Sequence, residues 1–313
     1  MKTRIAAVDL GTLTVRLALA EVSFPEGLRI LRHRREITAL GRGLKASGHL
    51  DPEAREKTLK ALREFAREMA DFGVTKGQGV ATEAVRQAAD GQKFLQEAEK
   101  VLNLPLRLLT PEEEARLTLK GVLSALDPGY LLRTLLVFDV GGGSSEFTLV
   151  RPGTEPVFAG LALGVLSLSQ ARPLGDPPHP ALVQDLQKEL KSELGHFFAT
   201  KFGPFLDPKP LLVGTAGAVT TLAALAQEMT RYDPKRINNF ILFRWRLAQL
   251  RSRLASLPET ERARLPGIEP AKAGVMVAGA LLVEAILDGV AQDRLIVIDA
   301  GLLEGLLAEL VSQ

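Results

Sequence analysis

The feature that most constrains the fold is a short pattern that occurs twice in the chain. In the first copy, the apolar residues 5–8 lead into Asp9-Leu10-Gly11-Thr12, and a strand-like alternation returns over residues 15–19. In the second copy, residues 135–138 lead into Asp139 and a Gly-Gly-Gly-Ser-Ser run, and residues 146–150 follow. Each copy predicts a strand, a glycine-containing turn and a second strand. The repetition therefore indicates two structurally related halves.

The remaining elements alternate between strands and helices. Asp51 and Pro52 have the preferences of a helix N-cap and first turn, and Gly73 is typical of a helix end. Further helices are expected over residues 93–101 and from about Val219, strands over 106–109 and 211–213, and a proline-rich loop over 172–180. This alternation is typical of an α/β architecture with mainly parallel strand pairing.

Composition narrows the classes of function. The 313 residues are enough for about two domains, and 39 basic residues against 37 acidic ones give no case for nucleic-acid binding. Without cysteine, disulfides, thiolate nucleophiles and cysteine zinc sites are excluded, and the four histidines lack metal-ligand spacing. The most apolar stretch, residues 273–283, is too short to cross a bilayer and predicts a buried helix. Since the N-terminus resembles no secretory signal, we expect a cytoplasmic protein without a membrane partner.

Three glycine-rich turns follow predicted buried strands and are candidate phosphate sites. Glycine lets the backbone come close to an anion, so that successive N–H groups converge on phosphate oxygens, and hydroxyl side chains add donors. In α/β proteins ligands gather at the carboxyl ends of strands. The alternative is that each glycine serves only its own turn. The candidate phosphate-binding residues are Gly11, Thr12, Gly141, Gly142, Gly143, Ser144, Ser145, Gly214 and Thr215.

Two of these turns carry an aspartate at the end of the strand, Asp9 and Asp139. Carboxylates suit Mg²⁺, which is often held by one or two of them together with substrate phosphate. The alternative is that each aspartate accepts hydrogen bonds from the backbone of its own turn. Because the aspartate recurs in both copies, the sequence favours a metal role.

The segment Thr110-Pro111-Glu112-Glu113-Glu114 predicts a helix start. Thr110 fits the N-cap and Glu113 its capping-box partner. Glu114 lies beyond that box, and its carboxylate is a candidate general base toward water. Arg86 is a candidate phosphate ligand, because a guanidinium donates two parallel N–H bonds to phosphate; the alternative is an ordinary surface arginine.

With these residues in view, the chain resembles the exopolyphosphatase / guanosine pentaphosphate phosphatase (Ppx/GppA) family of the actin–Hsp70–sugar-kinase group. The resemblance covers nearly the whole length, and the shared order of short motifs makes it specific. The segments that carry it include AVDLGT (7–12), ATEAVR (81–86), EEAR (113–116), FDVGGGS (138–144), GTAG (214–217) and GLLEG (301–305).

The resemblance implies two actin-like (ribonuclease H-like) domains that enclose a cleft. It implies one domain over residues 1–122, to which a C-terminal helix at about 300–313 returns, and a second over 123–299. It further implies hydrolysis of terminal phosphate from polyphosphate or a guanosine alarmone, aided by Mg²⁺ or another divalent cation. By motif match, Glu114 corresponds to the general base, Arg86 to a phosphate-binding arginine, and Asp9 and Asp139 to metal-associated carboxylates.

The chain departs from the family pattern at several positions near the expected site. Leu13 replaces an asparagine, Ala216 a glycine, Asn238-Asn239 a His-Gly pair, and Leu303 an arginine. Two other functions therefore remain open: an ATP-dependent kinase or ATPase of the same fold, and a non-catalytic sensor of polyphosphate or alarmones. Whether the protein forms a homodimer is likewise open.

Overall fold

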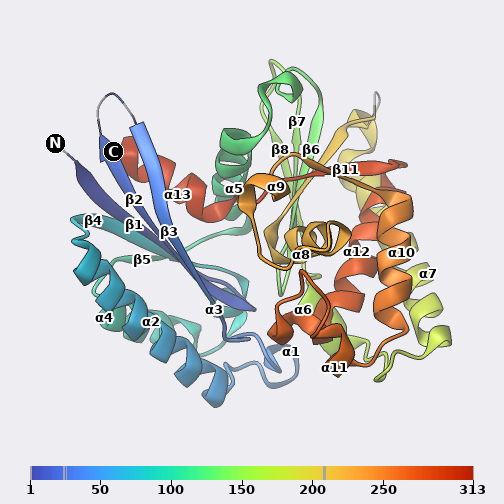
Figure 1. Ribbon diagram of the computed structural model, residues 1–313, viewed down its shortest axis with the longest axis horizontal. Helices are drawn as coiled ribbons and strands as arrows, with labels where there is room; N and C mark the ends of the chain where they lie inside the picture. Colours follow the sequence, from blue (N-terminus) through green and yellow to red (C-terminus); the bar gives the residue numbers. More distant parts are fainter. Residues whose placement is uncertain (1, 24, 26, 207–208, 313) are drawn as a thin grey trace. The chain divides into compact units, whose positions relative to one another are not determined.

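The chain folds into two compact units that share no sheet. The computed structural model describes residues 2–23, 25, 27–206 and 209–312. One unit comprises Met1–Ser124 and Gly301–Gln313, and the other Ala125–Ala300; the colours of Figure 1 show the red C-terminal helix beside the blue N-terminal strands. We call them unit 1 and unit 2.

Unit 1 contains a five-stranded sheet in the order β3-β2-β1-β4-β5. Strands β1 (Thr3–Leu10), β2 (Thr14–Ser23) and β3 (Gly27–Ile37) form an antiparallel meander, whereas β4 (Lys76–Ala81) and β5 (Leu106–Leu108) run parallel to β1. The predicted strands over residues 5–8, 15–19 and 106–109 are therefore confirmed.

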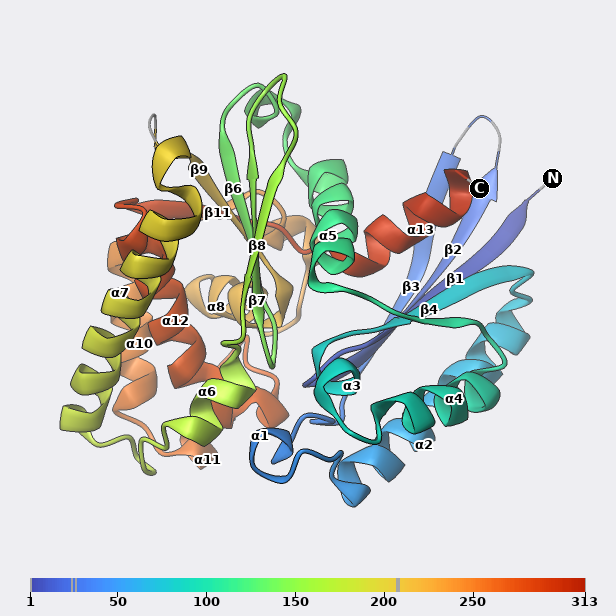
Figure 2. The same cartoon turned by 180° about the vertical axis from the view of Figure 1, so that it is seen from behind.

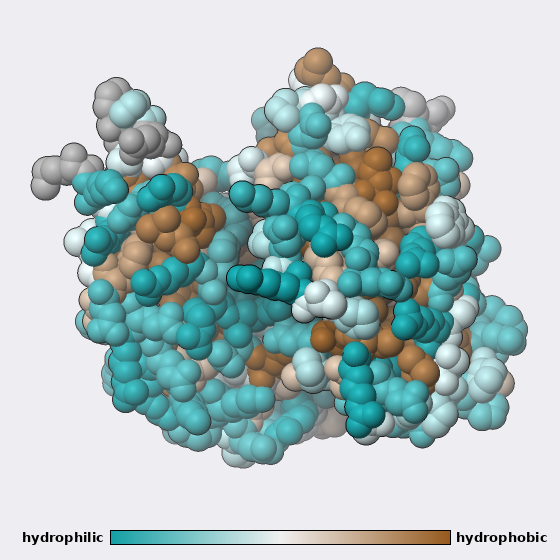
Figure 3. Space-filling view, in the orientation of Figure 1, coloured by the Kyte–Doolittle hydropathy of each residue, from teal (hydrophilic) through white to brown (hydrophobic). Residues whose placement is uncertain are grey.

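Helices cover both faces of this sheet. One face packs against α2 (Pro52–Phe72) and α4 (Gly91–Leu102) in a core that includes Phe65 and Phe94. Figure 3 shows the outer side of these helices as hydrophilic, as an amphipathic surface helix requires. The other face packs against α5 (Pro111–Ala125) and α13 (Leu302–Ser312), which lie beside each other in Figure 2. Two short helices, α1 (Leu44–Ser47) and α3 (Glu83–Gln87), complete the unit.

The boundaries of α2 follow the predicted signals. The Asp51 carboxylate accepts a hydrogen bond from Ala54 N at 2.8 Å, Pro52 occupies the first helical position, and Gly73 ends the helix at φ 75°. The carboxylate satisfies an N–H that has no partner within the helix, and the glycine adopts the left-handed conformation without a Cβ clash.

Unit 2 repeats the plan of unit 1 and adds an edge strand. Its sheet has the order β10-β11-β9-β6-β7-β8. Strands β6 (Leu135–Val140), β7 (Ser145–Val150) and β8 (Val157–Leu161) form the antiparallel meander, β9 (Leu211–Thr215) and β11 (Arg294–Val297) are parallel to β6, and β10 (Phe240–Phe243) pairs antiparallel with β11. The expectation of mainly parallel pairing is wrong. Each Asp-Gly turn joins two adjacent strands as a hairpin, and a hairpin makes antiparallel pairs.

The helices of unit 2 surround a core of phenylalanines in tilted and edge-to-face contact, together with the almost fully buried helix α12 (Met276–Gly289). Phe147 packs against Phe197 and Phe198 with ring centroids 5.1 and 5.2 Å apart. The helices are α6 (Val165–Ala171), α7 (Pro180–Phe202), α8 (Ala216–Ala226), α9 (Pro234–Ile237), α10 (Arg244–Ala255), α11 (Glu259–Arg262) and α12 (Met276–Gly289), with 3-10 turns at Pro128–Tyr130, Gly203–Phe205 and Pro270–Val275.

The stretch Pro270–Gly289 is long and apolar enough to cross a membrane by length and composition alone, but 83% of its apolar window is buried within the structure. The predicted buried helix over residues 273–283 is therefore confirmed as a core element. Helix α8, in contrast, begins at Ala216 rather than near Val219, because the chain passes from β9 into the helix without an intervening loop.

Candidate functional site

In unit 1 the predicted site residues lie at one end of the sheet. Strands β1, β4 and β5 are adjacent and parallel, so their carboxyl ends meet at the same edge. The turn of Gly11 and Thr12 follows β1, helix α3 follows β4, and helix α5 follows β5 after two residues.

Asp9 is paired with an arginine from the neighbouring strand. Asp9 and Arg16 are cross-strand partners on β1 and β2, and Asp9 Oδ2 accepts hydrogen bonds from Arg16 Nε at 2.8 Å and Nη2 at 2.6 Å. The Asp9 side chain is only 3% exposed, and within the described part of the chain its Oδ1 atom has no hydrogen-bond partner. The guanidinium thus balances the charge of a buried carboxylate.

The turn after β1 is held by its own backbone. Gly11 N donates to Thr14 O at 3.0 Å, and Thr12 O accepts from Gly41 N at 2.9 Å. Leu13 O accepts from the backbone of both Thr38 and Ala39. The carbonyls of Thr12 and Leu13 therefore anchor the next segment. Among the backbone hydrogen bonds found for residues 2–23, none uses the N–H of Thr12 or Leu13.

Glu114 lies in the first turn of α5, and the predicted capping box is confirmed. Thr110 N donates to Glu113 Oε2 at 2.8 Å, and Glu113 N donates to Thr110 Oγ1 at 3.2 Å. Glu112 instead pairs with Arg116 on the surface. The first two glutamates are thus engaged in a surface ion pair and in the capping box, respectively. The Glu114 side chain is 13% exposed and takes no part in the capping box.

Arg86 lies between two carboxylates. Its Nη2 donates to Glu83 Oε2, its Nη1 donates to the Leu109 carbonyl at 2.6 Å, and the same Nη1 lies 3.6 Å from Glu114 Oε2. Glu83 Oε1 accepts a further hydrogen bond from Gln87 Nε2. Arg86 is therefore not an isolated surface arginine, because it links α3 to the start of α5. Glu83 was not among the residues expected from the sequence.

The glycine turn of unit 2 reproduces that of unit 1. Gly141 N donates to Ser144 O at 3.0 Å, as Gly11 N does to Thr14 O. Gly142 O accepts from the first turn of α6, and the α6 N-cap, Gly164, approaches so closely that a Cβ there would lie 2.4 Å from the Gly142 carbonyl carbon. Among the backbone hydrogen bonds of the described residues, none uses the N–H of Gly142 or Gly143. The turn's own backbone hydrogen bonds therefore do not use these two donors, and successive N–H groups of this kind can bind phosphate.

Asp139 faces a second carboxylate. Asp139 on β6 and Glu146 on β7 are cross-strand partners, so both side chains stand on one face of the sheet, with Cβ atoms about 5 Å apart. Glu146 is 5% exposed and accepts a hydrogen bond from Ser144 Oγ at 2.6 Å, whereas Ser145 Oγ donates to the Leu163 carbonyl. Glu146 was not among the residues predicted from the sequence, although it occupies the position in the second copy that Arg16 occupies in the first.

This acidic pair fits a divalent cation better than Asp9 does. No group of three or more His, Asp or Glu side chains able to hold a metal occurs among the described residues. Mg²⁺ does not need such a group, since one or two carboxylates with phosphate oxygens and water complete its shell. Asp139 and Glu146 offer two carboxylates, whereas Asp9 already faces the guanidinium of Arg16.

The third turn contains a glycine that packing explains. A Cβ at Gly214 would lie 2.6 Å from the ring of Phe138, so this glycine is required by the core whether or not a phosphate binds. Thr215 Oγ1 donates to the Ala300 carbonyl at 3.0 Å and does not cap α8.

Lys272 was also not predicted from the sequence. It is 2% exposed, and its ammonium lies 3.4 Å from Glu269 Oε2 and beside the first turn of α8.

Two of the departures from the family pattern have a backbone explanation. Asn239 has φ 64° and Ala216 has φ 70°, so each residue that replaces an expected glycine lies in the left-handed region. Asparagine tolerates that region, whereas alanine does so at a cost of roughly 1–2 kcal/mol. Leu303 is 3% exposed in the core between α13 and β1, and is therefore a packing residue in this chain.

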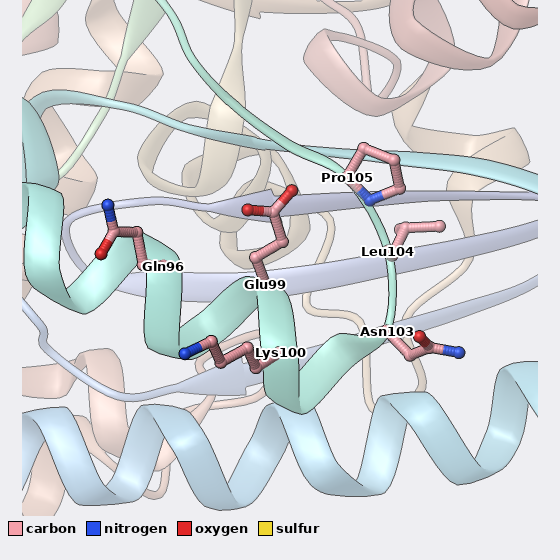
Figure 4. A pocket seen from close by; sticks show the side chains of 6 residues that line it. All are labelled: Gln96, Glu99, Lys100, Asn103, Leu104 and Pro105. Atoms are coloured by element: carbon pink, nitrogen blue, oxygen red, sulfur yellow. The ribbon is translucent and has the colours of Figure 1, made fainter.

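A shallow depression along α4 contains none of the predicted site residues. Figure 4 shows its lining side chains on the last turns of α4 and the segment that follows: Gln96, Glu99, Lys100, Asn103, Leu104 and Pro105. The Asn103 side chain points away from that of Gln96 in this view, so the polar groups do not converge on a common point.

Comparison with known proteins identifies close relatives. A model of the Ppx/GppA phosphatase family matches residues 20–313. Exopolyphosphatase 2 of Mycobacterium tuberculosis is 31% identical over 299 residues, which cover 91% of this chain and 90% of that protein. The crystal structure of a Ppx/GppA family member from Aquifex aeolicus is 30% identical, covers 99% of this chain and 97% of its own, and superposes with a TM-score of 0.79. An exopolyphosphatase from Cytophaga hutchinsonii shares the fold, with 23% identity, coverage of 99% and 98%, and a TM-score of 0.85. The prediction of two actin-like domains is thereby confirmed.

Proposed function

Because the chain belongs to the Ppx/GppA phosphatase family, we propose that it is a hydrolase that releases terminal phosphate from inorganic polyphosphate, guanosine pentaphosphate or both. Water attacks the terminal phosphorus, the bridging P–O bond breaks, and orthophosphate and a shortened chain leave. The name exopolyphosphatase borne by the relative from M. tuberculosis favours polyphosphate. We expect the protein in the cytoplasm.

The main structural support for this proposal is the position of Glu114 beside Arg86. Glu114 Oε2 lies 3.6 Å from Arg86 Nη1 at the carboxyl end of the parallel strands of unit 1. A carboxylate next to a guanidinium is what attack of water on a phosphate needs: the carboxylate orients the water and accepts its proton, and the guanidinium donates to a phosphate oxygen. Glu114 is the general base in this proposal and Arg86 a phosphate ligand.

Each unit has a glycine turn whose N–H groups suit phosphate oxygens: those of Thr12 and Leu13 in unit 1, and those of Gly142 and Gly143 in unit 2. Backbone donors of this kind cost no reorganisation when negative charge accumulates on a phosphoryl group. In place of the asparagine of the family pattern, Leu13 contributes only its backbone. Of the remaining candidates, Gly141, Ser144 and Ser145 fix the conformation of the turn in unit 2. Gly214 and Thr215 precede α8, and we expect any phosphate bound there to contact the start of that helix.

A divalent cation, Mg²⁺ by preference, would be held by Asp139 and Glu146. When bound, it supplies Lewis-acid stabilisation of phosphate oxygens. The Ser144 hydroxyl orients the Glu146 carboxylate through its hydrogen bond. Asp9, which we predicted from the sequence as a metal ligand together with Asp139, is in this proposal the carboxylate that fixes Arg16 on β2.

The alternatives make different predictions for the same assay. We propose to measure orthophosphate release from polyphosphate, guanosine pentaphosphate and ATP in parallel, with Mg²⁺ and with EDTA. Release from polyphosphate or guanosine pentaphosphate that EDTA abolishes supports the proposal. Release from ATP alone, or transfer of its phosphate to an acceptor, favours the kinase or ATPase. Tight binding of polyphosphate without release favours the sensor.

A further inference from the structure

Glu83 is a buried carboxylate to which the proposed reaction assigns no task. It is the first residue of α3 and is 8% exposed. Both of its oxygens are used: Oε2 accepts from Arg86 Nη2 and Oε1 from Gln87 Nε2. A buried carboxylate is costly unless it is paired and hydrogen-bonded, and here the pair is made with the phosphate-binding arginine itself.

The geometry around Arg86 distinguishes its two carboxylate neighbours. The guanidinium is hydrogen-bonded to Glu83 but lies 3.6 Å from Glu114, beyond hydrogen-bond distance. Arg86 Nη1 also donates a hydrogen bond to the Leu109 carbonyl at 2.6 Å, which further fixes the guanidinium. A guanidinium has five N–H donors, of which the hydrogen bonds to Glu83 and Leu109 use two. Arg86 therefore retains donors for a phosphate while it stays bound to Glu83.

Removal of the Glu83 carboxylate would change which group Arg86 binds. Arg86 is 21% exposed, so it needs a partner for its charge. The remaining carboxylate within 4 Å in the described structure is that of Glu114. An arginine without Glu83 would therefore close the gap to Glu114 and form a direct hydrogen-bonded pair with the proposed general base.

We propose that Glu83 is a positioning residue: its carboxylate holds the Arg86 guanidinium by a hydrogen bond and so keeps it out of hydrogen-bonding distance of Glu114. This inference rests on the proposed function, in which Glu114 acts on the water and Arg86 on the phosphate. Glu83 touches neither water nor substrate and acts only through Arg86.

The test is the kinetics of phosphate release by Glu83→Ala and Glu83→Gln, with melting temperatures measured alongside. Misplacement of a catalytic group by about 1 Å costs up to about 100-fold in rate. We therefore expect kcat of Glu83→Ala to fall about 10- to 100-fold while KM changes less than about threefold. Glu83→Gln keeps a hydrogen-bond acceptor for Arg86 and should recover part of the loss. The control is Glu112→Gln, which removes an exposed carboxylate from the same turn as Glu114 and should leave kcat unchanged.

A double variant separates positioning from a merely structural role. In an Arg86→Ala background, adding Glu83→Ala should lower kcat no further, because Glu83 acts through the missing guanidinium. An equal further loss in that background, or unchanged kcat in Glu83→Ala, overturns the inference. The Glu114→Gln variant keeps the two claims apart. Full activity of Glu114→Gln contradicts the proposed function, whereas an inactive Glu114→Gln with a fully active Glu83→Ala contradicts this inference alone.

Discussion

Asp139 lies opposite Glu146 on adjacent strands of unit 2, in the same relation that places Asp9 opposite Arg16 in unit 1. The two halves therefore share a backbone plan but differ in charge at one position. An aspartate opposite an arginine has its charge balanced, whereas two facing carboxylates favour a cation between them. This one difference within the repeated unit is the reason why we propose the cation site in unit 2.

The first prediction concerns the acidic pair. Glu146→Gln removes one of the two carboxylates and should weaken the apparent affinity for Mg²⁺ in phosphate release by about tenfold or more. A Mg²⁺ titration of the initial rate measures this. Glu155→Gln, which changes an exposed glutamate on the loop after β7, serves as the control. An unchanged Mg²⁺ dependence in Glu146→Gln would remove Glu146 from the cation site.

The second prediction concerns the pair in unit 1. Arg16→Met leaves the Asp9 carboxylate buried without its guanidinium, so stability should fall by about 3 kcal/mol. The double variant Asp9→Asn/Arg16→Met removes the charge as well and should regain part of that loss. Urea-induced unfolding followed by circular dichroism compares the three proteins. If Arg16→Met is as stable as the parent, then the buried Asp9 carboxylate does not depend on the Arg16 guanidinium.

The third prediction uses the left-handed residue at the start of α8. Ala216 has φ 70°, so Ala216→Gly should stabilise the protein by about 1 kcal/mol by relieving a Cβ clash. Ala218→Gly, within the same helix, is the matched control and should destabilise by about 1 kcal/mol. Thermal melting of both variants is the measurement. The account of this turn fails if both substitutions shift the melting temperature in the same direction.

The fourth prediction concerns pH and the capping box of α5. The Thr110 N–H lowers the pKa of the Glu113 carboxyl by donating to its charged form. Because the folded pKa lies below the unfolded one, the folded state binds fewer protons between them, and the stabilisation is present near neutral pH and lost as the pH falls through the folded value. Glu113→Gln should therefore be less stable than the parent by about 0.5 kcal/mol at pH 7, and this difference should shrink and disappear as the pH falls through the folded pKa. A difference that grows on acidification would contradict the sign of this effect.

The sequence was sufficient to predict the elements whose signals are local. The Asp51-Pro52 start, the Gly73 end and the Thr110–Glu113 capping box are confirmed because each depends on contacts within four residues along the chain. The repeated strand-turn-strand pattern likewise predicted that the chain has two structurally related halves. The pairing of the strands was predicted wrongly, because the alternation of strands and helices describes only the strands that helices connect, whereas each hairpin adds antiparallel pairs.

Contacts between residues that are distant in sequence could not be predicted from local sequence patterns. Lys272 comes next to Gly217 only through packing of the Pro270–Val275 turn against α8, and no short-range signal marks it. Glu83 and Glu146, in contrast, carried a readable signal. Glu83 lies three residues before Arg86, the spacing of neighbours on a helix, and Glu146 is the counterpart of Arg16 in the repeat.

The most direct test of the central claim is the rate of orthophosphate release from polyphosphate by Glu114→Gln in the presence of Mg²⁺, with melting temperature as the check of folding. Glutamine keeps the size and hydrogen bonding of the side chain but cannot accept the proton of the attacking water. The account predicts a folded variant whose kcat is lower by about 100-fold or more. A folded Glu114→Gln protein that releases phosphate at the parent rate would contradict it.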